Sequence, residues 1–165
     1  MLLYLMRHGI AIDHTDPDCP ADEERFLTKK GIEKTRAIAL GLRTLGILPE
    51  AMLSSPYVRA VQTAEITAAA FGFARDKIRK TDALIFGHKP AELFRETAKM
   101  RANEIICFGH APHLDEVIAL ALGCRGTVTS LKKAGVACLE MKSMAPPRGV
   151  LLWLCTPRIL RVLGE

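Results

Sequence analysis

The chain carries an arginine, a histidine and a glycine in succession at the end of its first apolar segment. Arg7, His8 and Gly9 follow the run Leu2–Met6, which predicts a buried strand. Arginine offers a planar fork of donors that matches phosphate oxygens, and histidine can act as a neutral nucleophile near physiological pH. Glycine lets the backbone turn sharply and approach a ligand closely. These residue types at a strand end indicate chemistry on a phosphate group.

A second group of residues that suits an anion follows the segment Ala51–Ser54, which predicts a short strand. Ser55 is a favourable N-cap and Pro56 suits the first helical position, so Arg59 is expected near the start of a helix. A cation there opposes the helix dipole unless a bound anion interacts with both charges. The alternative is an ordinary solvated arginine, which is the usual state of a lone helical Arg.

The third motif is Gly109-His110, which follows the predicted strand Glu104–Phe108 and precedes a helix that Pro112 begins. In isolation, a packed or capping role would be the better interpretation of His110. In α/β sheets, however, ligands bind outside the carboxyl ends of the strands. Three strand ends that carry Arg-His, Arg and His therefore predict one shared pocket.

Together these motifs resemble those of the histidine phosphatase superfamily, whose fold is phosphoglycerate-mutase-like, and they occur in the family's order. The short length and the Arg-His-Gly-x-Ala form are similar to the SixA-type phosphohistidine phosphatases. The segments that carry the resemblance are Arg7-His8-Gly9 with Ala11, Leu27-Thr28-Lys29-Lys30-Gly31, Ser54-Ser55-Pro56, Arg59-Ala60, Gln62-Thr63-Ala64 and Gly109-His110.

The resemblance implies a role for each of these side chains. His8 would be the nucleophile and would form a phosphohistidine that water then hydrolyses. Arg7 and Arg59 would clamp the nonbridging oxygens, Gly9 would lie against the phosphate, and His110 would donate to the phosphoryl group as charge develops. The residues alone do not distinguish His8 from His110 as the nucleophile. We expect the second ring nitrogen of His8 to bond a backbone carbonyl, which fixes its tautomer.

A general acid is expected from the segment before the third helix, where the family often uses a carboxylate. Asp82 stands at that place, and the alternative is a solvated loop aspartate. His88 is a second candidate, with exposure as its alternative. If the substrate is phosphohistidine, imidazole is a good leaving group and the acid becomes dispensable.

Chain length bears on the substrate, because the segment from Gly72 to Asn103 has room for one helix and little else. An open pocket suits a bulky substrate such as a protein side chain. A phosphatase that acts on protein phosphohistidine is therefore the favoured hypothesis, and a phosphatase of a small phosphomonoester is the alternative. A non-enzymatic phosphate- or nucleic-acid-binding module is disfavoured, because binding alone does not require paired strand-end histidines.

Composition limits the remaining classes. A length of 165 residues with 49% hydrophobic residues suits one domain that spans 1–165. The net charge of +5 favours acidic partners, but 5% aromatic residues and no recognised motif argue against nucleic acid. No apolar run reaches transmembrane length and no signal peptide is evident, so we expect a cytoplasmic protein with no membrane partner. The oligomeric state stays open.

The cysteines and histidines predict no metal site and no cofactor. The five cysteines form no Cys-x-x-Cys pair, and the five histidines are scattered. Reduced thiols are expected, with Cys107, Cys138 and Cys155 in the core and Cys19 in a polar loop.

The order of elements predicts an α/β fold, a three-layer α/β/α sandwich with a mostly parallel sheet and an antiparallel edge strand. Thr28 is the expected N-cap of a helix that runs to about Leu45, with an apolar stripe of Ile38, Leu42 and Leu45. The loop 10–26 is expected to be exposed. Besides the segments above, the pattern predicts helices over 56–71 and 90–100, a terminal helix from Pro157, and an edge hairpin of strands 136–141 and 150–156.

Overall fold

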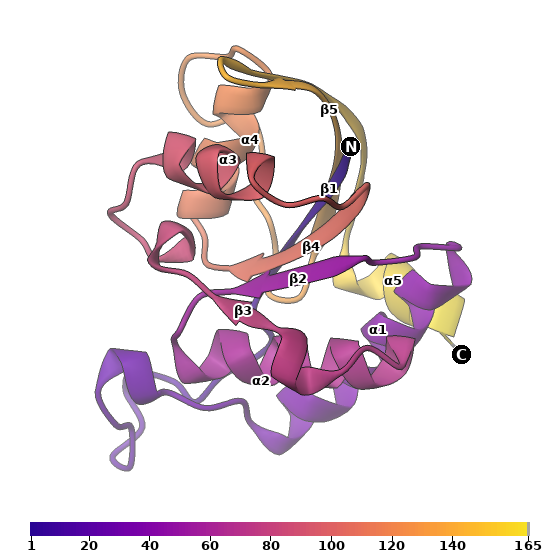
Figure 1. Ribbon diagram of the computed structural model, residues 1–165. Coiled ribbons are helices and arrows are strands. Elements are labelled where there is room, and N and C mark those ends of the chain that lie inside the picture. The colour runs from indigo at the N-terminus through magenta and orange to yellow at the C-terminus, as the bar shows by residue number, and fades with distance from the viewer. Residues whose placement is uncertain (165) are drawn as a thin grey trace.

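The computed structural model describes residues 1–164. The chain folds into a six-stranded sheet with helices on both faces (Figure 1). The strands are β1 (Leu2–Arg7), β2 (Ala51–Ser54), β3 (Arg79–Lys80), β4 (Glu104–Gly109), β5 (Val136–Met144) and β6 (Pro147–Cys155). The helices are α1 (Lys29–Thr44), α2 (Val58–Phe71), α3 (Pro90–Ala98), α4 (His113–Ala121) and α5 (Pro157–Gly164), with 3-10 turns at Asp22–Glu24, Arg75–Lys77 and Asp82–Leu84.

The sheet has the order β3-β2-β4-β1-β5-β6, and its first four strands are parallel. β5 pairs with β1 in the antiparallel direction, and β6 returns antiparallel beside β5 at the sheet edge. The predicted mostly parallel sheet with an antiparallel edge is confirmed. Parallel strands place their carboxyl ends at one edge, so β1, β2 and β4 deliver the residues that follow them to the same place.

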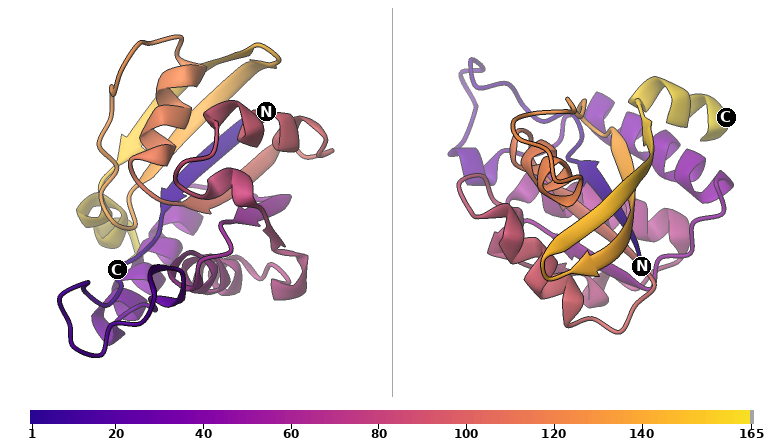
Figure 2. Two further views of the ribbon diagram at one scale, coloured as in Figure 1. Left: turned by 90° about the vertical axis from the view of Figure 1, so that its left-hand side faces the viewer. Right: turned by 90° about the horizontal axis from the view of Figure 1, so that it is seen from above.

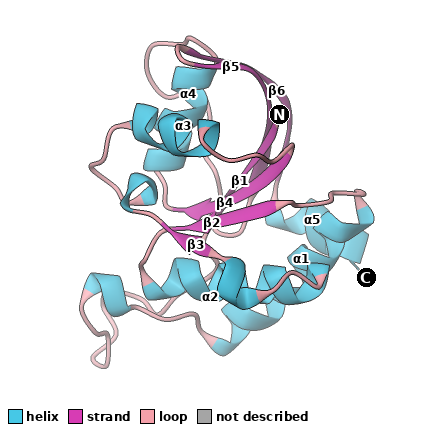
Figure 3. Cartoon of the chain, in the orientation of Figure 1, coloured by secondary structure: helices cyan, strands magenta, loops and turns pink. Residues whose placement is uncertain are grey.

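The three layers follow from the alternation of side chains along each strand. Leu3 and Leu5 of β1 pack with α3 and α4, while Tyr4 and Met6 face α1, α2 and α5. Figures 2 and 3 show these two groups of helices on opposite sides of the sheet. The predicted α/β/α sandwich is therefore confirmed.

Two glycines let the backbone of α5 lie directly against that of α1. A Cβ added at Gly41 would collide with the carbonyl of Leu160, and one added at Gly164 would collide with the carbonyl of Ala37. This close approach holds α5 against the second half of α1.

The boundaries of α1 and α2 test two predictions about local sequence. Thr28 is the N-cap of α1, and its hydroxyl accepts a hydrogen bond from the Gly31 N–H at 3.0 Å, as expected. The prediction for α2 is wrong by two residues. Ser55 and Pro56 remain in the loop and Tyr57 is the N-cap. The Ser55 hydroxyl accepts the Tyr57 N–H at 3.3 Å and also contacts Nε2 of His110.

Three further expectations need correction. Leu45 is not part of the buried stripe of α1, since it is the C-cap residue and lies 43% exposed. The hairpin strands extend well into the stretch expected as a loop, and Pro147 is tolerated because β6 is an edge strand. Cys107 and Cys138 are buried as predicted, but Cys155 is only half-buried at the end of that edge strand.

Candidate active site

The register of β1 and β4 brings two histidines together. Arg7 pairs with Gly109 in the parallel ladder, so His8 and His110 each lie one residue beyond a matched pair. The His8 N–H donates to the Gly109 carbonyl at 2.9 Å, which continues the pairing past the strand ends. The two imidazole rings have centroids 5.2 Å apart. The sheet thus places residues that are distant in sequence at one site.

His8 is fixed in one tautomer. Its Nδ1–H donates to the Gly9 carbonyl at 2.7 Å, so the expected bond to a backbone carbonyl is confirmed and Nε2 is left without the proton. Burial lowers the pKa of His8 to about 3, and the charges of His110, Arg59 and Arg7 act in the same direction. The imidazole is therefore neutral at physiological pH and keeps a free lone pair on Nε2.

His110 is buried beside His8 and is only partly bonded. Its Nε2 lies 2.8 Å from the Ser55 hydroxyl, and the edge of the Tyr57 ring packs against it at 5.1 Å. Its Nδ1 is buried without a hydrogen-bond partner among residues 1–164. Burial, followed by the charge of Arg59, lowers its pKa to about 3. A bound anion would reverse part of this shift, because a negative charge nearby favours the imidazolium.

Arg59 lies in the first turn of α2 and is 6% exposed, so it is not the ordinary solvated arginine that was the alternative. Its guanidinium stacks over the Tyr57 ring, 5.1 Å from the centroid. Nη2 lies 3.1 Å from an Asp22 carboxylate oxygen, and Nη1 donates to the Asp22 carbonyl. Asp22 thus supplies an anionic partner to the Arg59 guanidinium.

Arg7, the other arginine of the site, is bonded to the segment before β5. Arg7 donates from Nη1 to the Leu131 carbonyl at 2.8 Å. The Leu131 N–H and the Thr129 hydroxyl in turn donate to the buried Asp115 carboxylate, at 3.0 and 2.7 Å. Asp115, in the first turn of α4, therefore fixes the backbone that orients Arg7.

The loop 10–26 closes one side of the site through a buried arginine. Arg25 donates to the Ile12 carbonyl from both Nε and Nη2, at 3.0 and 2.6 Å, and to Asp22 from Nη1 at 3.0 Å. Although partial burial opposes the shift, the hydrogen bonds and charges of Arg25 and Arg59 lower the pKa of Asp22. The Asp22 carboxylate is therefore ionised at neutral pH.

Thr63 joins the first motif to α2. Its hydroxyl accepts the Gly9 N–H at 3.0 Å and donates to the Arg59 carbonyl at 2.7 Å. A side chain at Gly9 would collide with the hydroxyl of Thr35 on α1. Gly9 thus allows the tight packing that holds His8 between two helices.

These side chains line a cavity of about 560 Å³, which we call the phosphate cavity. The sequence-predicted Arg7, His8, Arg59 and His110 all line it, and Gly9 lies buried directly behind His8. The lining has four cations and only two carboxylates, so the cavity suits an anion; the cations are Arg7, Arg25, Arg59 and Lys133, and the carboxylates are Asp13 and Asp22. The complete lining is Arg7, His8, Asp13, His14, Asp22, Arg25, Tyr57, Arg59, Phe86, His110, Ala111, Pro112 and Lys133.

Two predicted residues lie elsewhere. Asp82 is exposed at the start of its 3-10 turn and is not among the residues that line the phosphate cavity. His88 is exposed and pairs with Glu92, with 3.0 Å between Nδ1 and the carboxylate. Neither residue joins the four that the structure brings together, and a role for Asp82 as acid remains a prediction.

Sequence reasoning missed the contribution of the loop, namely Asp22 and Arg25. Their only local signal is that Arg25 is the single arginine in a loop rich in carboxylates. It also assigned Ser55 to a helix cap, whereas its hydroxyl meets His110. Both errors concern contacts between residues far apart in the chain.

No three histidine, cysteine, aspartate or glutamate side chains within residues 1–164 come together as a metal site would require. In the same range no helix has the length and apolar character needed to cross a bilayer.

The sequence comparisons identify relatives of this chain. Residues 3–85 match the profile of the histidine phosphatase superfamily, branch 1. An uncharacterized protein of the cyanobacterium Picosynechococcus sp. (strain PCC 7002) is 40% identical over 139 residues, which cover 82% of each chain.

Solved structures share the fold at lower identity. The protein histidine phosphatase SixA in complex with tungstate superposes with a TM-score of 0.81 at 24% identity, covering 97% of this chain and 99% of that one. A putative phosphohistidine phosphatase SixA from Agrobacterium tumefaciens gives 0.73 at 21%, with 94% and 97% covered. A phosphoserine phosphatase mutant from Entamoeba histolytica gives 0.72 at 16%, with 96% and 98% covered.

Proposed function

This chain belongs to the histidine phosphatase superfamily, and from that premise we propose that it is a metal-independent phosphatase that dephosphorylates phosphohistidine on a protein. His8 is the nucleophile, through the unprotonated Nε2 that its bond to the Gly9 carbonyl leaves free. Arg7, Arg59 and His110 surround the phosphoryl group. The chemistry proceeds by two transfers, first to His8 and then to water.

In the first transfer the lone pair of His8 Nε2 forms a bond to phosphorus as the bond to the leaving group breaks. The leaving group departs with that electron pair and takes up a proton. Arg7 and Arg59 neutralise the nonbridging oxygens, and His110 donates a hydrogen bond to them. In the second transfer a water oxygen bonds to phosphorus, His8 leaves as a neutral imidazole, and phosphate is released.

Some of the hydrogen bonds between Asp22 and Arg59 must break when substrate binds. Its carboxylate and carbonyl both contact the Arg59 guanidinium, which is the group that would meet the phosphoryl oxygens. The carboxylate remains bonded to Arg25, so the loop stays anchored while Arg59 exchanges one anion for another.

One observation supports phosphohistidine as the substrate. The two carboxylates that line the phosphate cavity, Asp13 and Asp22, both have a lowered pKa, the former because Thr15 donates to it from its backbone and its hydroxyl. Neither is suited to give a proton to a departing alkoxide. Imidazole leaves readily without such an acid, whereas an alkyl phosphate benefits from one.

A second candidate is a phosphatase of a small phosphomonoester. The volume of the phosphate cavity, about 560 Å³, lies in the range of small-molecule sites. The similarity in fold to a phosphoserine phosphatase supports the same substrate class.

The test compares kcat/KM for a phosphohistidine peptide, phosphoserine and an aryl phosphate. We expect the phosphohistidine peptide to exceed phosphoserine by at least about 10²-fold, the size of a missing general acid. A preference for phosphoserine would favour the second candidate. Loss of all three activities in EDTA, with restoration by one divalent ion, would contradict the metal-independent mechanism.

A further inference from the structure

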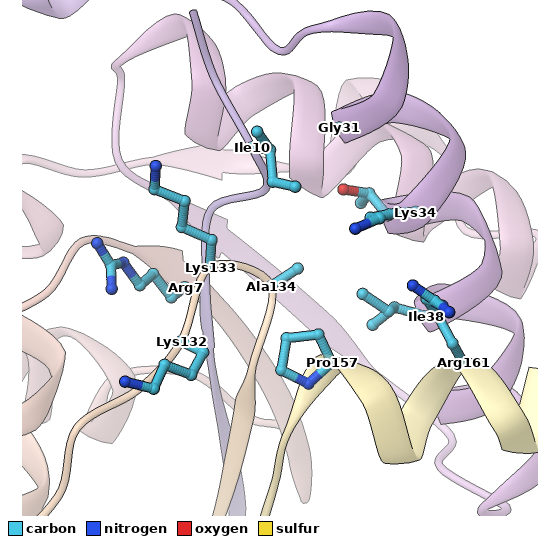
Figure 4. A pocket seen from close by; sticks show the side chains of 11 residues that line it. Arg7, Ile10, Gly31, Lys34, Ile38, Lys132, Lys133, Ala134, Pro157 and Arg161 are labelled. Carbon is cyan, nitrogen blue, oxygen red and sulfur yellow. The ribbon is translucent and has the colours of Figure 1, made fainter. Parts of the chain in front are cut away.

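A second cavity, of about 410 Å³, adjoins the phosphate cavity and shares Arg7 and Lys133 with it. We call it the α1–α5 pocket, because it lies between those helices and the segment before β5. Figure 4 shows Lys34 and Arg161 reaching into this region from one side, and Arg7, Lys132 and Lys133 on the other. Its lining also includes the apolar residues Ile10, Ile38, Ala134 and Pro157.

Three cations line this pocket and not the phosphate cavity, namely Lys34, Lys132 and Arg161. Lys34 and Arg161 are half-buried, and Lys132 is exposed. Within residues 1–164 none of the three forms an ion pair with a carboxylate. Like charges that share a half-buried pocket disfavour one another, and an anionic ligand would relieve this.

Thr35 forms part of the inner wall of the pocket. Its side chain lines the α1–α5 pocket and is fully buried, yet its hydroxyl has no hydrogen-bond partner among residues 1–164. A buried hydroxyl without a partner is rare, because it loses its bonds to water and gains none in return. This hydroxyl faces Gly9, where an added Cβ would collide with it, so this wall of the pocket packs directly against the residue that follows His8.

We propose that the α1–α5 pocket binds a glutamate side chain of the phosphoprotein substrate, next to the phosphorylated histidine; this inference rests on the proposed function. The methylene groups would pack against Ile38 and Pro157, and the carboxylate would meet Lys34 and Arg161. The apolar walls and cationic margin match a short acidic side chain. The shared Arg7 and Lys133 place this contact beside the reacting phosphoryl group.

The test is a series of phosphohistidine peptides in which one glutamate is moved through the positions on either side of the phosphohistidine. Each peptide has a control with glutamine at the same position. We expect one position at which glutamate lowers KM about tenfold relative to glutamine while kcat is unchanged, as a half-buried charge-assisted contact would do.

Variants then assign the preference to the pocket. Lys34→Ala and Arg161→Ala should each reduce the ratio of kcat/KM between the glutamate and glutamine peptides to near one. Because each variant is compared with its own glutamine peptide, general damage to the enzyme cancels. Lys30→Ala, on the exposed side of α1, is the matched control and should keep the full ratio.

Each outcome separates the inference from the function on which it rests. Hydrolysis of all peptides without a glutamate preference would overturn the pocket assignment and leave the function intact. A preference that persists in Lys34→Ala and Arg161→Ala would also overturn it, because Lys133 of the phosphate cavity would then suffice. Inhibition by free glutarate without any glutamate preference would show a small-anion site instead. Failure to hydrolyse any phosphohistidine peptide, with phosphoserine hydrolysed, would refute the proposed function itself.

Discussion

The two cavities on either side of Arg7 hold their cations in opposite ways. In the phosphate cavity Arg59 and Arg25 are buried and bonded to Asp22 and to backbone carbonyls. In the α1–α5 pocket, Lys34 and Arg161 are half-buried and form no ion pair within residues 1–164. Buried donors suit a transition state, since they need little rearrangement as charge develops once Arg59 has exchanged Asp22 for the phosphoryl group. Cations on an apolar wall that have no carboxylate partner within residues 1–164 suit recognition of an acidic side chain.

The largest expected effect belongs to His8, the proposed nucleophile in the phosphate cavity. His8→Ala should lower kcat by at least about 10⁴-fold, because no other group can replace a covalent step. The measurement is the initial rate on an aryl phosphate, with an alkaline quench of labelled enzyme to trap the phosphoenzyme. Equal phosphoenzyme yield in His8→Ala would move the nucleophile elsewhere, with His110 as the next candidate.

Arg59 should be next in size. Arg59→Ala removes a donor that the structure holds in place, so we expect kcat to fall by about 10²–10³-fold. Arg75→Ala is the control, because Arg75 is exposed and lies outside both cavities. The inhibition constant of inorganic phosphate should rise in Arg59→Ala only. If the two variants behaved alike, Arg59 would not be a donor to the phosphoryl group.

Stability should depend on pH through the buried histidines. His8 and His110 have pKa values of about 3 when folded, so the unfolded chain binds more protons once the pH falls below about 6.5. Stability is therefore retained above that pH and decreases below it. Between pH 7 and pH 5 we expect a loss of roughly 2 kcal/mol for each histidine.

Denaturant unfolding in a phosphate-free buffer measures this loss. Replacing one histidine, as in His110→Asn, should remove about half of the pH dependence. Lys34→Ala should leave the dependence unchanged, because the α1–α5 pocket contains no histidine. A wild-type stability that does not change between pH 7 and pH 5 would contradict the neutral state of both rings.

Asp115 should act through the backbone that holds Arg7. Asp115→Ala leaves the Thr129 hydroxyl and the Leu131 N–H without their acceptor, so unfolding should become easier by about 2–3 kcal/mol. The affinity for phosphate should fall as well, and Asp115→Asn should restore both, since its amide oxygen can accept the same bonds. Glu116→Ala, on the exposed side of α4, is the control. An Asp115→Asn variant as impaired as Asp115→Ala would show that the charge, and not the hydrogen bonding, matters.

The smallest effect is expected at Asp82, which lies outside both cavities. If leaving-group protonation is dispensable, Asp82→Asn should change kcat/KM on a phosphohistidine peptide less than about twofold. A loss of about 10²-fold confined to phosphoserine would identify Asp82 as an acid for alkyl phosphates.

Local sequence predicted those parts of the molecule that depend on near neighbours. The apolar run before Arg7 and the strands before Ser55 and Gly109 are found where expected. The Thr28 cap is confirmed, and it could be predicted because it joins residues only three apart in the chain. The predicted start of α2 is wrong at Ser55, whose hydroxyl contacts both the Tyr57 N–H and Nε2 of His110. Only the first of these contacts is local in sequence.

The sequence by itself determined the sandwich, the strand ends and the four side chains at them, because strand periodicity and the parallel order bring carboxyl ends to one edge. Only the tertiary structure decided that Asp22 meets Arg59, that Asp115 orients Arg7 through Leu131, and that Lys34 and Arg161 border one pocket. These pairs come from elements far apart in the chain. Their meeting depends on strand register and on the glycine contacts between α1 and α5, which no short-range pattern encodes.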